Sequence, residues 1–161
     1  GIPKGLNVSL KMKKDDRQNW ETWKEWHSAT RNCWEAISVT QKPLENNYIN
    51  TLDKYGVGLL KTKDNTSENF LSNVFENYKR DKKDDFNEHI TIKPISLIKK
   101  LIEISTPLNN ENIVIDPFIG SGTTAVATRS LGINFIGCEI NNNYIEIAKR
   151  RLDNTNLDTL F

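Results

Sequence analysis

The sequence predicts an α/β fold, and three observations in its C-terminal half predict it. Residues 113–115 form a short β-branched apolar run that suits a buried strand. A turn with two glycines follows, and residues 123–131 can then form a helix that Gly132 ends. Residues 133–138 are a second apolar run, and Glu139 comes directly after it. Strand, helix and strand in this order predict a parallel βαβ unit, from which open α/β sheets are built.

The first third of the chain is predicted to hold two helices, a strand and a further helix. Residues 6–14 suit a short helix, and paired aspartates at the start of residues 15–30 can cap a second one. That second helix carries tryptophans three residues apart, and we favour their packing against the sheet over base stacking or a protein interface. They are Trp20, Trp23 and Trp26. Residues 34–40 suit a buried strand, and residues 43–54 can form a helix that a glycine-containing segment breaks.

Residues 61–88 are polar and lack a strong period, so their default interpretation is a mobile surface insertion. One apolar pattern in this segment suggests a turn or two of amphipathic helix. Its residues are Phe70, Leu71, Val74, Phe75 and Tyr78. Pro94 then opens a helix with an apolar stripe, and Asn141 can cap the last helix of the chain. The stripe consists of Leu97, Ile98, Leu101 and Ile102.

Composition narrows the class of protein further. The chain has 161 residues and a formal net charge of +1, so it is long enough for one core and shows no overall basic character. Two runs are rich in charged residues, 11–16 and 79–85. Their default interpretation is solvated loops, and the alternative is contact with the phosphates of a DNA duplex. Neither Cys33 nor Cys138 has a partner at metal-binding spacing, so we predict no metal and no disulfide, with Cys138 buried in its strand. No apolar run approaches the length of a membrane span, and a reducing cytoplasm is the natural compartment.

Each of the two predicted strands ends in an acid, Asp116 or Glu139, at the edge where open α/β sheets bind ligands. Gly120 and Gly122, with Ala125, satisfy the pattern G-x-G-x-x-G/A, and Glu139 lies about twenty residues on, as for an acid that binds a ribose. Taken alone, this pattern is a weak signal for a dinucleotide. Asp116 argues against one, because its carboxylate would repel a pyrophosphate at a cost of roughly 1–4 kcal/mol.

The same carboxylate favours a cationic ligand. S-adenosylmethionine (SAM) carries an ammonium group, a sulfonium and a ribose diol, and it has no phosphate. Asp116 can neutralise its cationic end, the glycines can let the backbone approach, and Glu139 can accept hydrogen bonds from both ribose hydroxyls. The alternatives are a nicotinamide-dependent oxidoreductase and an ordinary doubly wound protein with a capped turn.

Three segments carry a family resemblance. Residues 116–124, DPFIGSGTT, match the signature D-P-F-x-G-S-G-T-T, and residues 89–94 match H-x-T-x-K-P. Residues 137–151 match G-x-E-x-x-x-x-Y-x-x-x-A-x-x-R. Together they resemble the SAM-dependent DNA methyltransferases that modify N6 of adenine or N4 of cytosine. Their order resembles the permuted β-class, in which the catalytic half precedes the cofactor half. The resemblance is strong over residues 89–152 and weaker over residues 1–54.

The resemblance implies a Rossmann-like SAM-dependent methyltransferase fold with three layers, present in part as one domain over residues 1–161. Within it, residues 89–152 are the SAM-binding half and residues 60–88 a target-recognition insertion that contacts DNA bases. Thr91 and Lys93 lie over the methionine end of the cofactor, whereas the role of His89 is only capping or packing. The implied cofactor-binding residues are Thr91, Lys93, Asp116, Phe118, Gly120, Ser121, Gly122, Thr123, Thr124, Glu139 and Ile140, with Phe118 and Ile140 as an apolar wall for adenine.

The resemblance further implies site-specific methyl transfer from SAM to an exocyclic base amine of double-stranded DNA, with no membrane partner. One motif of such enzymes is absent, because no two prolines of this chain are adjacent and the catalytic Pro-Pro-aromatic loop is missing. That loop accepts the amine protons and stacks on a flipped base, so the catalytic residues are unknown. We expect the C-terminal portion of a larger enzyme, with a decayed, non-catalytic SAM-binding module as the alternative. A homodimer and either a restriction-modification or a phage setting are compatible with the sequence.

Overall fold

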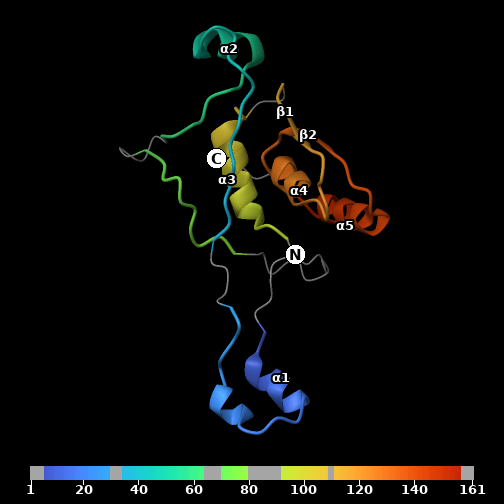
Figure 1. Ribbon diagram of the computed structural model, residues 1–161. Coiled ribbons are helices and arrows are strands. Elements are labelled where there is room, and N and C mark those ends of the chain that lie inside the picture. The colour runs from blue at the N-terminus through green and yellow to red at the C-terminus, as the bar shows by residue number, and fades with distance from the viewer. Residues whose placement is uncertain (1–5, 30–33, 64–69, 80–91, 109–110, 157–161) are drawn as a thin grey trace. The chain divides into compact units, whose positions relative to one another are not determined.

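The computed structural model describes most of the chain and divides it into two compact units (Figure 1). The described residues are 6–29, 34–63, 70–79, 92–108 and 111–156. The units are Gly1–Gln41 and Lys42–Phe161.

The first unit begins with helix α1 (Val8–Lys14), which confirms the short helix predicted at this position. Asn7 caps it, because its side-chain oxygen accepts a hydrogen bond from the Leu10 N–H at 3.0 Å. The backbone N–H of Val8 donates to the Trp26 carbonyl oxygen at 3.1 Å. This bond holds the start of α1 against the far end of the segment that follows it.

The helix predicted over residues 15–30 is wrong. α1 ends at Lys14, and only a short 3-10 helix, η1 (Trp20–Trp23), follows it. Asp16 and Asn19 adopt positive φ angles of 55° and 62°, which a continuous helix does not allow. Asp and Asn side chains compete for backbone hydrogen bonds and favour turns, so the paired aspartates end one helix and do not begin another.

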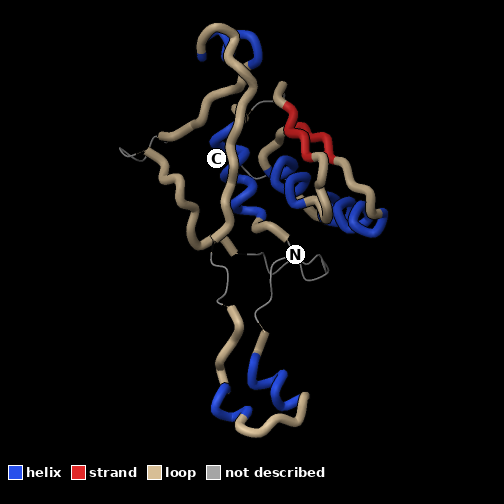
Figure 2. The backbone as a smooth tube through the Cα atoms, in the orientation of Figure 1, coloured by secondary structure: helices blue, strands red, loops and turns tan. Residues whose placement is uncertain are grey.

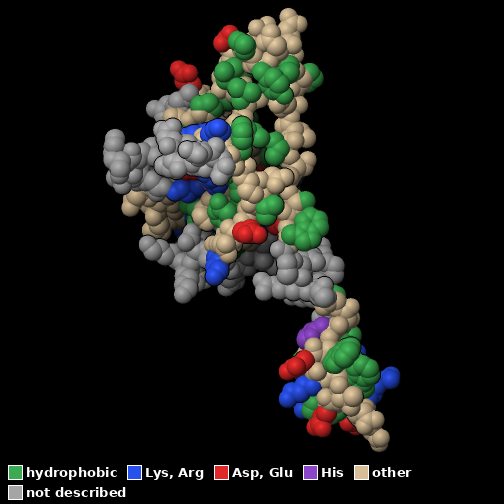
Figure 3. Space-filling model, turned by 90° about the vertical axis from the view of Figure 1, so that its left-hand side faces the viewer, with side chains coloured by type: hydrophobic (Ala, Val, Ile, Leu, Met, Phe, Trp, Pro, Cys, Tyr) green, Lys and Arg blue, Asp and Glu red, His purple; other side chains and the backbone are tan. Residues whose placement is uncertain are grey.

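The tryptophans of this unit do not form one helix face. Trp23 and Trp26 pack edge to face, with ring centroids 5.5 Å apart, and the Lys13 ammonium lies 4.8 Å from the centroid of Trp20. Charged and hydrophobic side chains lie close together on the face of this unit seen in Figure 3. The strand predicted over residues 34–40 is also wrong, since the described part of this unit contains no strand for it to pair with, and Trp34 is 83% exposed.

The second unit contains the predicted βαβ arrangement. Its elements are α2 (Tyr48–Tyr55), α3 (Ile95–Ser105), β1 (Ile113–Asp116), α4 (Thr123–Ser130), β2 (Asn134–Gly137) and α5 (Asn142–Asp153). Pro94 precedes α3 and Asn141 caps α5, as predicted. Gly132 follows α4 with a φ of 67°, which confirms it as the residue that ends the helix.

Helix α2 starts later than predicted. Its first turn is capped by Asn47, whose side chain accepts from the Asn50 N–H at 2.9 Å, and Gly56 ends it in the left-handed conformation. The residues before it form a loop in which Glu45 meets the ammonium of Lys54 at 2.8 Å. That ammonium, helped by the hydroxyl of Tyr55, lowers the pKa of the Glu45 carboxyl.

The core of this unit covers one face of the sheet. The two strands β1 and β2 lie side by side (Figure 2). They are parallel, and Val114 pairs with Phe135 in the register. Ala127 and Leu131 come from the α4 region and pack with Ile133 and with α3; Ile102 is the buried contribution of α3. Strand burial needs both hydrogen-bonded neighbours and apolar cover, and this layer of helices supplies the cover on one side.

The other face of the sheet is uncovered in the part of the chain that the structure describes. Ile115 and Ile136 pair in the register and are 66% and 51% exposed. Cys138 has the same parity as Ile136, so it is exposed, and the prediction of a buried cysteine is wrong. Two layers of the predicted three are therefore present among these residues. None of the described helices is long and apolar enough to cross a membrane, and the same residues contain no cluster of metal ligands.

Candidate cofactor site

The turn between β1 and α4 is held at its first residue by Asp116. One carboxylate oxygen accepts from the Phe118 N–H at 3.0 Å, and the other accepts from the Thr124 hydroxyl at 2.6 Å. The acid is half-buried at the end of β1 and lies beside the first turn of α4, where a helix dipole favours negative charge. Asp116 therefore ties the strand end to the helix start and places one negative charge at the turn.

Glu139 holds the same turn from the end of the neighbouring strand. Its Oε2 accepts from the Gly120 N–H at 3.0 Å, and its Oε1 accepts from the Asn141 N–H at 2.8 Å. Each carboxylate oxygen can accept two hydrogen bonds, so one position remains on each for a ligand hydroxyl. The two acids that the sequence places at strand ends thus meet at one turn.

Gly122 is required for helix packing. Its φ is 85°, and a Cβ built on it would lie 2.6 Å from the Cβ and 3.0 Å from the Cα of Ala148 in α5. A side chain cannot fit there without moving the backbone of α5. The sequence predicts close approach of a ligand at both Gly120 and Gly122. The packing of α5 already explains why residue 122 is a glycine. Close approach of a ligand remains a prediction for Gly120.

Three hydroxyl residues among the predicted cofactor ligands point into the protein. Ser121 and Thr123 are buried, at 4% and 9% exposure, and both lie within hydrogen-bond distance of the Arg151 guanidinium. Thr124 donates to Asp116. These three side chains hold the turn in place. A ligand at residues 121–124 would therefore meet the backbone of the turn and not these hydroxyl groups.

Two apolar residues flank the turn and are open to solvent. Phe118 is 88% exposed and lies two residues after the end of β1, and Ile140 is 98% exposed and lies three residues after the end of β2. Exposed apolar side chains beside a polar turn suit an aromatic ligand ring. Lys93 is exposed just before α3, whereas Thr91 and His89 lie outside the described residues.

Sequence reasoning missed the role of Arg151, which it noted only as the last position of the motif over residues 137–151. It is 3% exposed, and its Nη1 donates to the Ser121 carbonyl oxygen at 2.6 Å. The available signal was helix spacing. Arg151 lies three residues after Ala148, so both are on the same helix face, and Ala148 is the residue that touches Gly122.

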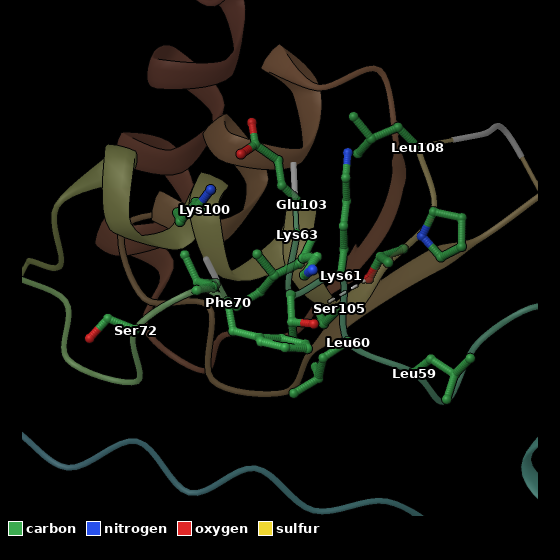
Figure 4. A pocket seen from close by; sticks show the side chains of 15 residues that line it. Leu59, Leu60, Lys61, Lys63, Phe70, Ser72, Lys100, Glu103, Ser105 and Leu108 are labelled. Carbon is green, nitrogen blue, oxygen red and sulfur yellow. Dashed lines mark hydrogen bonds between the residues drawn. The ribbon is translucent and has the colours of Figure 1, made fainter. Parts of the chain in front are cut away.

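A separate cavity of about 930 Å³ lies at the C-terminal end of α3 (Figure 4). Residues 59–63 form one wall and are anchored there by the Lys61 N–H, which donates to the Ile104 carbonyl oxygen at 2.7 Å. The ammonium of Lys63 lies 4.9 Å from the ring centroid of Phe70. The amphipathic turn predicted around Phe70 is wrong for the described residues 70–79, which form a loop.

The charged side chains of this cavity are mostly basic. Lys61, Lys63 and Lys100 line it against one carboxylate, Glu103 (Figure 4). None of its lining residues belongs to the turn between β1 and α4. The cavity and the turn are therefore two distinct features of the second unit.

Comparisons with known proteins identify the family of this chain. A family described as DNA methylase, the N6/N4 methyltransferases, matches residues 6–150 of this chain. The chain belongs to this family of N6-adenine and N4-cytosine DNA methyltransferases.

Curated relatives and one solved structure define the extent of the similarity. The type II methyltransferase M.HindIII of Haemophilus influenzae is 34% identical over 147 residues, which are 87% of this chain and 47% of the relative. The DNA adenine methyltransferase YhdJ of Escherichia coli is 46% identical over 70 residues, 44% of this chain and 23% of the relative. The crystal structure of an M1.HpyAVI–SAM complex is 48% identical over 38% of this chain and 31% of that chain, with a TM-score of 0.37. The chain spans about half the length of M.HindIII and less of the others.

Proposed function

We propose that the chain binds SAM at the turn between β1 and α4 and forms the cofactor part of a site-specific DNA methyltransferase. The observation that carries this proposal is the meeting of Asp116 and Glu139 at one turn through three hydrogen bonds. Family membership supports it, because the matched relatives are named as DNA methyltransferases.

Four residues at or beside the turn have separate tasks in this proposal. The free lone pairs of Glu139 accept the ribose hydroxyls, and the charge of Asp116 offsets the ammonium of the cofactor. Phe118 and Ile140 supply apolar contact for the adenine ring. SAM supplies an electrophilic methyl group, which the base amine takes while the carbon–sulfur bond breaks and a proton leaves the nitrogen. No residue of this sequence is assigned as the acceptor of that proton.

The reaction is tested by incubating the protein with duplex DNA and tritiated SAM and digesting the DNA to nucleosides. Label on N6 of adenine or N4 of cytosine is the expected product of the complete enzyme. Binding of the cofactor by the complete enzyme without any transfer to DNA would support the non-catalytic SAM-binding module instead. A cytoplasmic location belongs to the proposal, because DNA is the substrate and the named relatives come from bacteria.

The segment over residues 60–88 is proposed to contact DNA, with the basic cavity of α3 as a phosphate contact. Three lysines against one carboxylate favour an anionic occupant, and contacts to phosphate fix register without reading sequence. None of the residues that line the cavity belongs to the turn between β1 and α4, so a phosphate contact there suits DNA that flanks the modified base.

Replacing Lys61, Lys63 and Lys100 together by glutamine is expected to weaken duplex binding equally for all sequences. Each phosphate contact contributes about 0.9 to the slope of log affinity against log salt, so the slope should fall by about 2 to 3. Fluorescence anisotropy of a labelled duplex over a salt series measures it. The exposed pair Lys149→Gln and Arg150→Gln on α5 is the control. An unchanged slope in the triple variant would remove the cavity from the DNA-binding surface.

A further inference from the structure

Among the described residues, Arg151 is the only charged residue that is buried, with 3% of its surface exposed. It lies in the last turn of α5, and its Nη1 donates to the Ser121 carbonyl oxygen at 2.6 Å and lies 3.3 Å from the Thr123 hydroxyl. A buried guanidinium is unfavourable unless its N–H groups are satisfied. The turn between β1 and α4 supplies these acceptors, about thirty residues away in sequence.

These bonds fix a segment that would otherwise be free. Ser121 stands between Gly120 and Gly122, whose φ angles are 55° and 85°, and glycine populates many backbone conformations. The Gly122 N–H donates to the Ile119 carbonyl oxygen at 2.9 Å. Both polar groups of the peptide unit between Ser121 and Gly122 are therefore held, the N–H by Ile119 and the carbonyl by Arg151.

The turn is thus held from two directions. Glu139 binds the Gly120 N–H from the strand side, and Arg151 binds the Ser121 carbonyl from the α5 side. Ala148, three residues before Arg151, is close enough to Gly122 to exclude a Cβ there. Because the Arg151 side chain is buried behind the turn, it does not reach a ligand on the exposed side.

We propose that Arg151 is a positioning residue, which sets the backbone of residues 120–122 so that Glu139 presents its free lone pairs to the cofactor ribose. The inference rests on the proposed function, since it concerns the cofactor turn. Arginine suits this position because Nη1 of its planar fork reaches both the Ser121 carbonyl oxygen, at 2.6 Å, and the Thr123 hydroxyl, at 3.3 Å. A lysine carries the same charge, but its compact ammonium cannot reproduce that fork.

The test compares Arg151→Lys with Arg150→Lys, an exposed neighbour on the same helix. Three quantities are measured for each: the Kd for S-adenosylhomocysteine by calorimetry, the Tm, and amide hydrogen exchange. For Arg151→Lys, we expect the Kd to rise about tenfold and the Gly122 amide to exchange faster, while exchange at Ile102 in the core stays as in the wild type. Arg150→Lys should change none of the three.

A lower Tm for Arg151→Lys with wild-type Kd and wild-type exchange at Gly122 would overturn the inference, because Arg151 would then act only on stability. Should Arg151→Lys fail to fold, Thr123→Val removes one acceptor at nearly constant shape, and a smaller change in the same direction is expected. Failure of the wild-type protein to bind S-adenosylhomocysteine would contradict the proposed function alone. Exchange at Gly122 would still decide whether Arg151 positions the turn.

Discussion

Replacing Gly122 by alanine is expected to lower the free energy of unfolding by about 2–5 kcal/mol. Two costs add. A non-glycine residue at a φ of 85° loses about 1–2 kcal/mol, and the new Cβ would meet Ala148 at 2.6 Å, an overlap of the kind that costs about 1–3 kcal/mol. Urea unfolding of the variant measures the sum.

Gly56→Ala is the matched control for this prediction. Gly56 also has a positive φ, 65°, but nothing lies within 4 Å of a Cβ built on it. Gly56→Ala should therefore lower the free energy of unfolding only by the conformational cost of a positive φ, about 1–2 kcal/mol. Equal losses for the two variants would show that α5 does not pack against the turn as closely as described.

Replacing Glu139 by alanine is expected to raise the Kd for S-adenosylhomocysteine by at least about 100-fold. Hydrogen bonds to a charged group contribute about 1.5–3 kcal/mol each. The variant loses the two hydrogen bonds proposed for the ribose hydroxyls, and it also loses the hydrogen bond from the Gly120 N–H that holds the turn. Calorimetric titration measures affinity, and thermal unfolding shows that the loss of affinity exceeds the loss of stability.

Glu146→Ala serves as the control, because Glu146 is an exposed glutamate of α5 that pairs with Lys149 at 2.9 Å, outside the turn. It should leave the Kd unchanged. If Glu139→Ala binds as tightly as the wild type, Glu139 is not part of the cofactor site.

The βαβ unit could be predicted because its signals are local. An apolar run predicts each strand, Gly132 predicts the end of α4, and Asn141 predicts the start of α5. The N-terminal third could not be predicted in the same way. Asp16 can cap a helix or end one, and only its positive φ shows which, while an apolar run such as residues 34–40 becomes a strand only where a partner strand pairs with it.

The two acids of the candidate site could be predicted from the sequence, but the residues that hold the turn in place could not. Asp116 and Glu139 follow strands, so their meeting at one sheet edge follows from topology. The inward direction of Ser121 and Thr123 depends on where α5 packs, which brings Arg151 to the turn from about thirty residues away. Long-range packing of this kind leaves no local pattern in sequence.

One face of the sheet has no cover among the described residues, and this agrees with the partial length of the family match. Ile115 and Ile136 are apolar and exposed on that face, and parallel sheets are normally covered on both. The chain spans 47% of M.HindIII. We propose that the remaining part of the domain covers this face and brings the catalytic loop that is missing here.

Calorimetric titration with S-adenosylhomocysteine, with NADH as comparison, tests the central claim most directly. Binding of S-adenosylhomocysteine alone, with a Kd in the range of about 1–100 μM, is the expected result, because the turn, Asp116 and Glu139 are all in place without the catalytic loop. Binding of NADH, or of neither compound, would contradict the claim that this turn is a SAM site that functions within the 161 residues.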